Sequence, residues 1–202
     1  MDNKLPIYKA TIQDDETGMF AISLVDDPAV ESNFLYFNND KAPMMFTVQN
    51  EEKRLVRGVI MECDKLIYRR TSEGYEYYIT FDESTIRLMA QKYLADGFQN
   101  NVDTMHNGQL ESGVQMVQWF ISDKEHGVNP EGFEDIADHS LFAEFHVSND
   151  EIWGAIKDGT VRGFSLAGFF EPVPVEAKKQ EPKNNVLNEI EGLLDKIINK
   201  LK

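Results

Sequence analysis

Many short apolar segments run through this chain, and this pattern restricts the folds it can adopt more than any other feature. Ten segments of four to nine residues are rich in β-branched and aromatic side chains, and turns containing Gly, Asn, Asp or Pro separate many of them. The segments predict these strands: Ile7–Ile12, Met19–Val25, Phe34–Phe37, Met44–Val48, Leu55–Glu62, Tyr75–Phe81, Val102–His106, Val114–Ile121, Leu141–Val147 and Arg162–Phe170.

Two further segments have helical spacing. The first begins at Asp82, has apolar residues at positions 86, 89, 90, 93 and 94, and ends at Gly97. The second begins at Ser148, which forms a predicted capping box with Glu151, and ends at Gly159. Many strands with two helices predict an α+β, mainly β fold: a closed or partly open β-barrel with flanking helices.

The end of the chain differs from the rest. We expect residues 1–171 to form the main domain and residues 172–185, which are polar and contain prolines, to form a linker. Residues 186–202 carry leucines and isoleucines at 3-4-3-4 spacing, which predicts an amphipathic helix of two heptads. A helix this short needs a partner, whether its own domain, a second copy of the chain or another protein.

The charge and the apolar pattern exclude several classes of protein. The chain has a net charge of −15, and the part before residue 176 has −16, so we expect it to bind no nucleic acid and to attract basic partners. No apolar run approaches 18 residues, which predicts no membrane span, and Met1–Pro6 lacks the apolar stretch of a signal peptide. The single cysteine, Cys63, allows no internal disulfide and no Cys-based zinc site. No metal or cofactor is implied.

The four histidines differ in their surroundings. His106 ends a predicted strand before an Asn-Gly turn, where a side chain can be both fixed and accessible, so it is the candidate base. The polar loops around His126 and His139 favour solvent-exposed or structural roles. His146 ends a strand before a helix, and a structural role is favoured there too.

Ser165 is the candidate nucleophile. It lies between Gly163 and Gly168, and glycines allow a peptide backbone to approach closely. A bulged or tightly packed strand would explain the same glycines. The α/β-hydrolase elbow is excluded, because Phe169–Val173 reads as strand and then linker where that fold needs a helix. Spacing alone does not establish a His–Ser pair.

Four segments resemble the phage serine proteases of the prohead (capsid maturation) group. These are Gly58–Met61, Val102–Asn107, the Trp-containing helix Glu151–Gly159 and the Gly-Phe-Ser strand Val161–Gly168. The block from Gly58 to Glu171 that holds them covers somewhat over half of the chain.

The resemblance implies a serine endopeptidase with Ser165 as nucleophile and His106 as general base, in a barrel similar to the herpesvirus assemblin. It implies scaffold, major capsid and portal proteins as substrates, cleaved inside the assembling prohead in the cytoplasm of a bacterial host. Self-association through the C-terminal helix would suit such a protein.

One motif departs from the family pattern. Family members carry a Glu-Val/Ile-Ser-Leu-Val segment after the serine strand, and its acid resembles the third triad member. Here the matching segment, Ala21–Val25, lies near the N-terminus and has alanine at the acid position, which suggests a circular permutation. Strand alternation places Asp103 on the face opposite His106, and Asp26 or Glu171 could reach from a neighbouring strand. The third member is left open.

Two alternatives to a maturation protease follow from the same residues. The missing acid allows a non-catalytic capsid scaffold or core protein that keeps the protease fold. The other alternative is a hydrolase that acts on unrelated substrates, in which the match of His106 and Ser165 to the family pattern is a coincidence.

Overall fold

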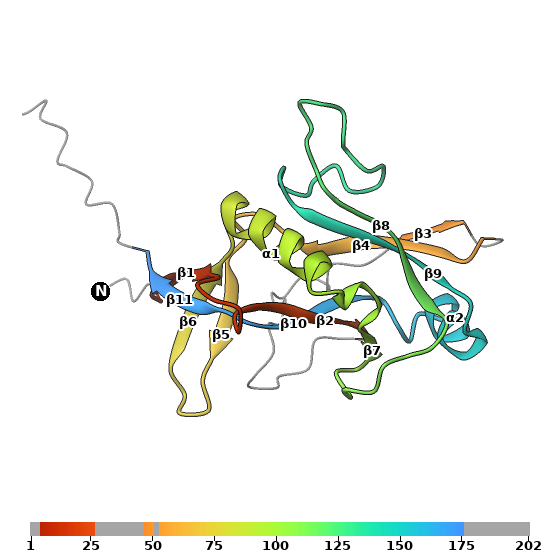
Figure 1. The fold of residues 1–202 in the computed structure, drawn as a ribbon, viewed down its shortest axis with the longest axis horizontal. Coiled ribbons are helices and arrows are strands. Elements are labelled where there is room, and N and C mark those ends of the chain that lie inside the picture. The colour runs from red at the N-terminus through yellow and green to blue at the C-terminus, as the bar shows by residue number, and fades with distance from the viewer. Residues whose placement is uncertain (1–4, 27–46, 51–52, 176–202) are drawn as a thin grey trace, which may run out of the picture.

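The computed structural model describes residues 5–26, 47–50 and 53–175. Eleven strands, two α-helices and one 3₁₀ helix (η1) lie in these ranges (Figure 1). The elements are β1 (Ile7–Thr11), β2 (Gly18–Val25), β3 (Thr47–Asn50), β4 (Leu55–Met61), β5 (Ile67–Arg70), β6 (Glu76–Thr80), α1 (Glu83–Ala95), η1 (Phe98–Asn100), β7 (Val102–Thr104), β8 (Val114–Ile121), β9 (Leu141–Val147), α2 (Asp150–Lys157), β10 (Gly163–Phe169) and β11 (Glu171–Pro174).

The strands form three sheets. Their orders are β11-β1-β6-β5, β10-β2-β7 and β3-β4-β9-β8. The mainly β fold with two helices is therefore as predicted, but hydrogen bonds between the described strands do not close the sheets into a barrel. Side-chain packing joins the second and third sheets instead, as where the ring of Phe164 on β10 lies 5.1 Å from that of Phe145 on β9.

The three-stranded sheet forms one wall of the core. Its central strand, β2, pairs antiparallel with β10 and parallel with β7. Alternate side chains of β2, Ile22 and Leu24, are fully buried, and α1 packs against this strand (Figure 1). Ser23 and Ala21, which alternate with these residues along the strand, therefore point to the other face of the sheet.

Helix α1 starts as the sequence predicted. Asp82 is its N-cap, and the carboxylate accepts a hydrogen bond of 2.9 Å from the Thr85 backbone N–H. Lys9 and the Ser84 hydroxyl also contact this carboxylate. Burial raises the pKa of Asp82, but the hydrogen bonds from these partners outweigh it and hold the pKa at about 2.

Helix α2 corrects the predicted capping box. Its N-cap is Asn149, whose side chain accepts hydrogen bonds from the backbone N–H groups of Glu151 and Ile152. Ser148 lies one residue earlier, and its hydroxyl donates to the Gly113 carbonyl at 3.1 Å. Asn is as good a cap as Ser, so the motif fixed the helix start to within one residue.

A bulge in β10 explains one of the glycines near Ser165. The register with β2 shifts between Ala167 and Gly168. A Cβ atom on Gly168 would lie 2.6 Å from the Gly18 carbonyl oxygen and 2.7 Å from the Phe170 ring, so the strands meet too closely for a side chain.

Two short strands were not predicted, and several boundaries moved. β5 has four residues, and β11 contains Pro172 and Pro174, which lack the N–H group that strand pairing uses. β11 lies at a sheet edge beside β1, where proline is tolerated, and it includes the first residues of the predicted linker. The predicted strand Phe34–Phe37, most of Met44–Val48 and the helix at 186–202 lie outside the described residues.

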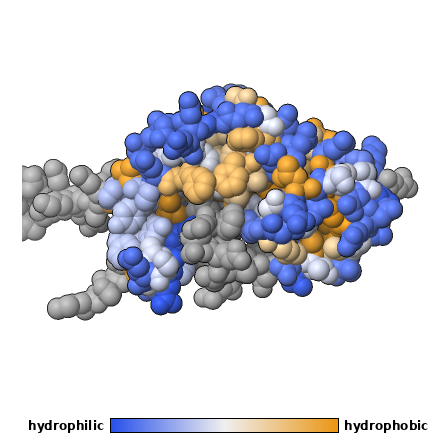
Figure 2. Space-filling view, turned by 60° about the horizontal axis from the view of Figure 1, so that its bottom comes forward, coloured by the Kyte–Doolittle hydropathy of each residue, from blue (hydrophilic) through white to orange (hydrophobic). Residues whose placement is uncertain are grey.

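One face of the molecule is largely hydrophilic (Figure 2). Figure 2 shows hydrophilic side chains over much of the face that it presents, with smaller hydrophobic areas between them. Among the described helices, none is long and apolar enough to cross a membrane.

Candidate active site

Ser165 lies in the middle of β10 and is directly opposite Ser23 on β2. Side chains of directly opposed residues share a face of the sheet, with Cβ atoms about 5 Å apart. Ser165 is 2% exposed and Ser23 is fully buried. The two hydroxyls are thus side by side in a site that is shielded from water.

His106 lies in a tight turn, not in the strand that the sequence predicted. β7 ends at Thr104, and the Asn107 N–H donates to the Thr104 carbonyl at 3.1 Å. Met105 and His106, the central residues of this turn, have φ angles of 51° and 53°. Positive φ at both positions is typical of a type I′ turn and costs non-glycine residues about 1 kcal/mol or more each. Such strain is commonly found at functional sites.

The turn places the imidazole of His106 between the two serines. Nε2 lies 2.9 Å from Ser165 Oγ, and Nδ1 lies 2.8 Å from Ser23 Oγ. Both distances are those of hydrogen bonds. The three side chains therefore form a continuous series: Ser165, His106, Ser23.

This series has the arrangement that activates a serine. A base within hydrogen-bond reach can take the hydroxyl proton, and a third group on the other ring nitrogen fixes the tautomer and orientation of the base. Here a neutral hydroxyl holds the position where a carboxylate usually lies. A hydroxyl orients the ring but stabilises its protonated form less than a carboxylate does, because charge-assisted hydrogen bonds are roughly twice as strong.

The sequence interpretation did not include Ser23. The motif match directed attention to Ala21, which lies opposite Ala167, two pairs further along the strands than Ser165 and Ser23. Alternation puts Ala21 and Ser23 on one face, so the motif identified the strand and face of Ser23 but not Ser23 itself. A signal was present, because Ser23 is a polar residue between Ile22 and Leu24 in a buried strand.

The other proposed acids have different positions. Asp26 is exposed after the end of β2, and Glu171 is exposed on β11 in a different sheet. Asp103 is 5% exposed and lies opposite Ser23 on β7. The alternation that set Asp103 apart from His106 does not apply, because the strand ends between them.

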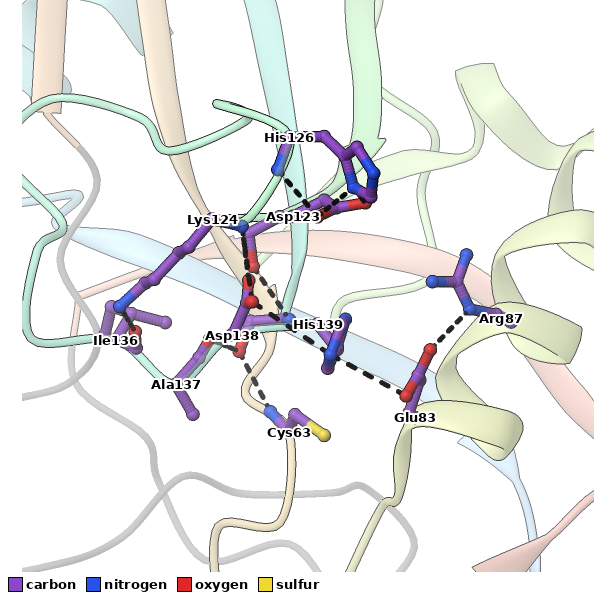
Figure 3. A network of polar contacts seen from close by, with 12 residues as sticks. Cys63, Glu83, Arg87, Asp123, Lys124, His126, Ile136, Ala137, Asp138 and His139 are labelled. Atoms are coloured by element: carbon purple, nitrogen blue, oxygen red, sulfur yellow. Dashed lines mark hydrogen bonds and ion pairs between the residues drawn. The ribbon is translucent and has the colours of Figure 1, made fainter.

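The remaining histidines lie away from this series. Figure 3 shows His126 and His139 in a polar network on the loop between β8 and β9. His126 is largely exposed and contacts Asp123 at 2.8 Å, and His139 Nε2 lies 3.7 Å from Glu83. His146 is half-buried on β9, opposite Gln115. In the described part of the chain, no group of three or more His, Cys, Asp or Glu residues could hold a metal ion.

Cys63 is a poor alternative nucleophile. Burial and the neighbouring carboxylates, Asp64 first among them, raise the pKa of its thiol to about 12. A thiol with that pKa is almost entirely protonated near neutral pH and therefore unreactive.

Comparison with known proteins identifies the family. Residues 43–173 match the family described as "Putative phage serine protease XkdF". The chain belongs to this family. The matched region contains both His106 and Ser165, whereas Ser23 precedes it.

Two curated relatives come from Bacillus subtilis (strain 168). The chain is 23% identical to "Uncharacterized protein YqbD" over 185 residues, which cover 88% of this chain and 52% of that protein. It is 26% identical to "Phage-like element PBSX protein XkdF" over 165 residues, which cover 77% of this chain and 54% of that protein. The chain thus spans about half the length of these relatives. No solved structure matches.

Proposed function

We propose that this chain is a phage serine endopeptidase in which Ser165 is the nucleophile and His106 is the general base. The observation that carries the proposal is the continuous series from Ser165 Oγ through both ring nitrogens of His106 to Ser23 Oγ. Ser23 is the third member. Membership of a phage serine protease family supports the same reaction class.

The reaction is an acyl transfer in two halves. His106 Nε2 takes the Ser165 proton while Oγ attacks the carbonyl carbon of a peptide bond, and the carbonyl oxygen becomes an oxyanion. The protonated ring then gives its proton to the leaving amine, and the C–N bond breaks. Water, deprotonated by the same nitrogen, hydrolyses the acyl-enzyme and returns the proton to Ser165.

The substrates we propose are scaffold, major capsid and portal proteins, cleaved inside the assembling prohead in the host cytoplasm. Membership of a phage protein family supports phage proteins as substrates, without indicating which ones. The catalytic domain, predicted as residues 1–171, then extends through β11 to Pro174. The rest of the predicted linker, residues 172–185, follows that strand, and residues 186–202 form a helix that docks to scaffold or to a second copy.

We also propose that the fold derives from an assemblin-like barrel by circular permutation. The antiparallel pairing of β2, which carries the Ala21–Val25 motif, with the serine strand β10 supports this. In a permuted chain, a strand that followed the serine strand in the sequence would keep its place beside it in the sheet.

Co-expression with the scaffold and capsid proteins of the same phage tests the function. We expect the wild type to shorten one or more of these proteins and Ser165→Ala to leave them intact, as measured by mass spectrometry. Ser140→Ala is the matched control, because Ser140 is equally buried but lies directly before β9, where its hydroxyl donates a hydrogen bond to the Ala137 carbonyl. Cleavage by Ser165→Ala at the wild-type rate would refute the assignment.

A second function is favoured by one observation. The third position holds a neutral hydroxyl instead of a carboxylate. This is consistent with a capsid core protein that has kept the protease fold and lost catalysis. Such a protein would leave every phage protein intact in both the wild type and Ser165→Ala, and proheads would still require it for assembly.

A further inference from the structure

A row of three polar side chains crosses the serine-bearing sheet. Ser165 on β10 lies opposite Ser23 on β2, and Ser23 lies opposite Asp103 on β7. Directly opposed residues point to the same face, and neighbouring strands are about 4.8 Å apart. Asp103 is therefore the next side chain beyond Ser23, on the side away from Ser165.

The role of Ser23 depends on the direction of its hydrogen bond. His106 can take a proton from Ser165 only if Nε2 is unprotonated, so that Nδ1 carries the ring hydrogen and donates it to Ser23 Oγ. If Ser23 donated to Nδ1 instead, the ring hydrogen would sit on Nε2 and the base would be blocked. The Ser23 hydrogen therefore needs another acceptor, and Ser23 is fully buried from water.

One carboxylate oxygen of Asp103 accepts no hydrogen bond. Its Oδ2 accepts a hydrogen bond of 2.8 Å from the Gly108 backbone N–H, while its Oδ1 is buried and accepts none. The other buried carboxylate among the described residues, Glu144, forms an ion pair of 2.8 Å with Arg57, and no such pair is present at Asp103. A buried carboxylate oxygen without a partner is unusual and calls for an explanation.

We propose that Asp103 is a positioning residue of the active site: its Oδ1 accepts the Ser23 hydroxyl hydrogen and so makes Ser23 an acceptor for His106 Nδ1–H. Because the two residues are directly opposed on neighbouring strands about 4.8 Å apart, their side chains are close enough for such a bond. The inference rests on the proposed function, because it concerns the tautomer that the base needs. It extends the series to Ser165, His106, Ser23 and Asp103, with the carboxylate acting through a hydroxyl.

Asp103→Asn separates this role from the structural one. The hydrogen bond with Gly108 N–H, which spans the His106 turn, requires an oxygen, so the Asn Oδ1 takes that place and its NH₂ group faces Ser23. The amide then donates to the Ser23 hydroxyl, which in turn donates to Nδ1. The fold is kept and the tautomer is reversed.

The ring tautomer of His106 in the full chain is measured by its ¹⁵N chemical shifts at a pH where the ring is neutral. We expect the hydrogen on Nδ1 in the wild type and on Nε2 in Asp103→Asn. Asp123→Asn is the matched control, because Asp123 also contacts a histidine, His126, on an exposed loop outside this row. An unchanged His106 tautomer in Asp103→Asn would overturn the proposal.

A double-mutant cycle with Ser23→Ala gives a second readout. The rate of Ser165 modification by a fluorophosphonate probe should fall about 100-fold in Asp103→Asn, as expected when general-base catalysis is lost. In the Ser23→Ala background, the same substitution should change the rate by no more than about twofold, because the connecting hydroxyl is gone. A loss of equal size in both backgrounds would mean that Asp103 acts on the fold alone.

The experiments distinguish failure of the proposed function from failure of the role given to Asp103. If the wild type does not react with the probe at Ser165, the proposed function is wrong, whatever the tautomer. If Ser165 reacts and the His106 tautomer is the same in Asp103→Asn as in the wild type, the proposed function is retained and the role given to Asp103 is wrong.

Discussion

Ser23→Ala is the perturbation that bears most directly on the unusual third member. It removes one hydroxyl from a fully buried position and leaves His106 Nδ1 without the partner that lies 2.8 Å away. Losing this hydrogen bond beside a fully buried position costs about 1–3 kcal/mol. If this free energy is added to the activation barrier for attack by Ser165, the rate falls by about 5- to 150-fold, at about 1.36 kcal/mol per tenfold.

The assay is the rate of Ser165 modification by a fluorophosphonate, followed by intact mass, together with urea unfolding. Ser140→Ala is the control, because it removes a hydroxyl that is equally buried and hydrogen-bonded to Ala137 and Cys63. We expect both variants to lose stability and only Ser23→Ala to lose reactivity. Reactivity within about twofold of the wild type in Ser23→Ala would refute the role of Ser23.

Further substitutions also have expected outcomes. His106→Ala should lower the rate of Ser165 modification by about 10²–10⁴-fold, whereas His126→Ala should leave it unchanged, and equal rates in the two variants would move the base elsewhere. Gly168→Ala should cost about 1–3 kcal/mol in urea unfolding because its Cβ has no room. Gly154→Ala, in α2 with nothing within 4 Å of the new Cβ, should instead stabilise by about 0.5–1 kcal/mol. Asp82→Ala should cost about 1 kcal/mol near neutral pH. The pKa of Asp82 is lowered to about 2 from an ordinary 3.8, so this stabilisation is present above pH 3.8 and lost as the pH falls through 2, where the urea midpoints of variant and wild type should converge.

The sequence predicted those elements whose pattern is local. Val114–Ile121 and Leu141–Val147 were predicted with the boundaries that the structure shows, because alternating or continuous apolar residues end at clear turns. The start of α1 was predicted because Asp82 is a strong N-cap. β11 was missed because its two prolines exclude it from any strand but an edge strand.

The residues of the candidate site could be predicted from the sequence only where the pattern is local. His106 and Ser165 lie in recognisable motifs, and the structure brings their side chains into contact. Ser23 and Asp103 enter the site through strand register between segments far apart in the sequence. Register is set by the packing of the whole sheet, and a single sequence does not reveal it.

The catalytic role of Ser165 is tested by covalent labelling. The full chain is treated with a fluorophosphonate, and the modified residue is located by mass spectrometry of its peptides. We predict one phosphonyl group on Ser165 in the wild type, none in Ser165→Ala, and strongly slowed labelling in His106→Ala. A wild-type chain that stays unlabelled, or a Ser165→Ala chain labelled at the wild-type rate, would contradict a serine peptidase built on Ser165 and His106.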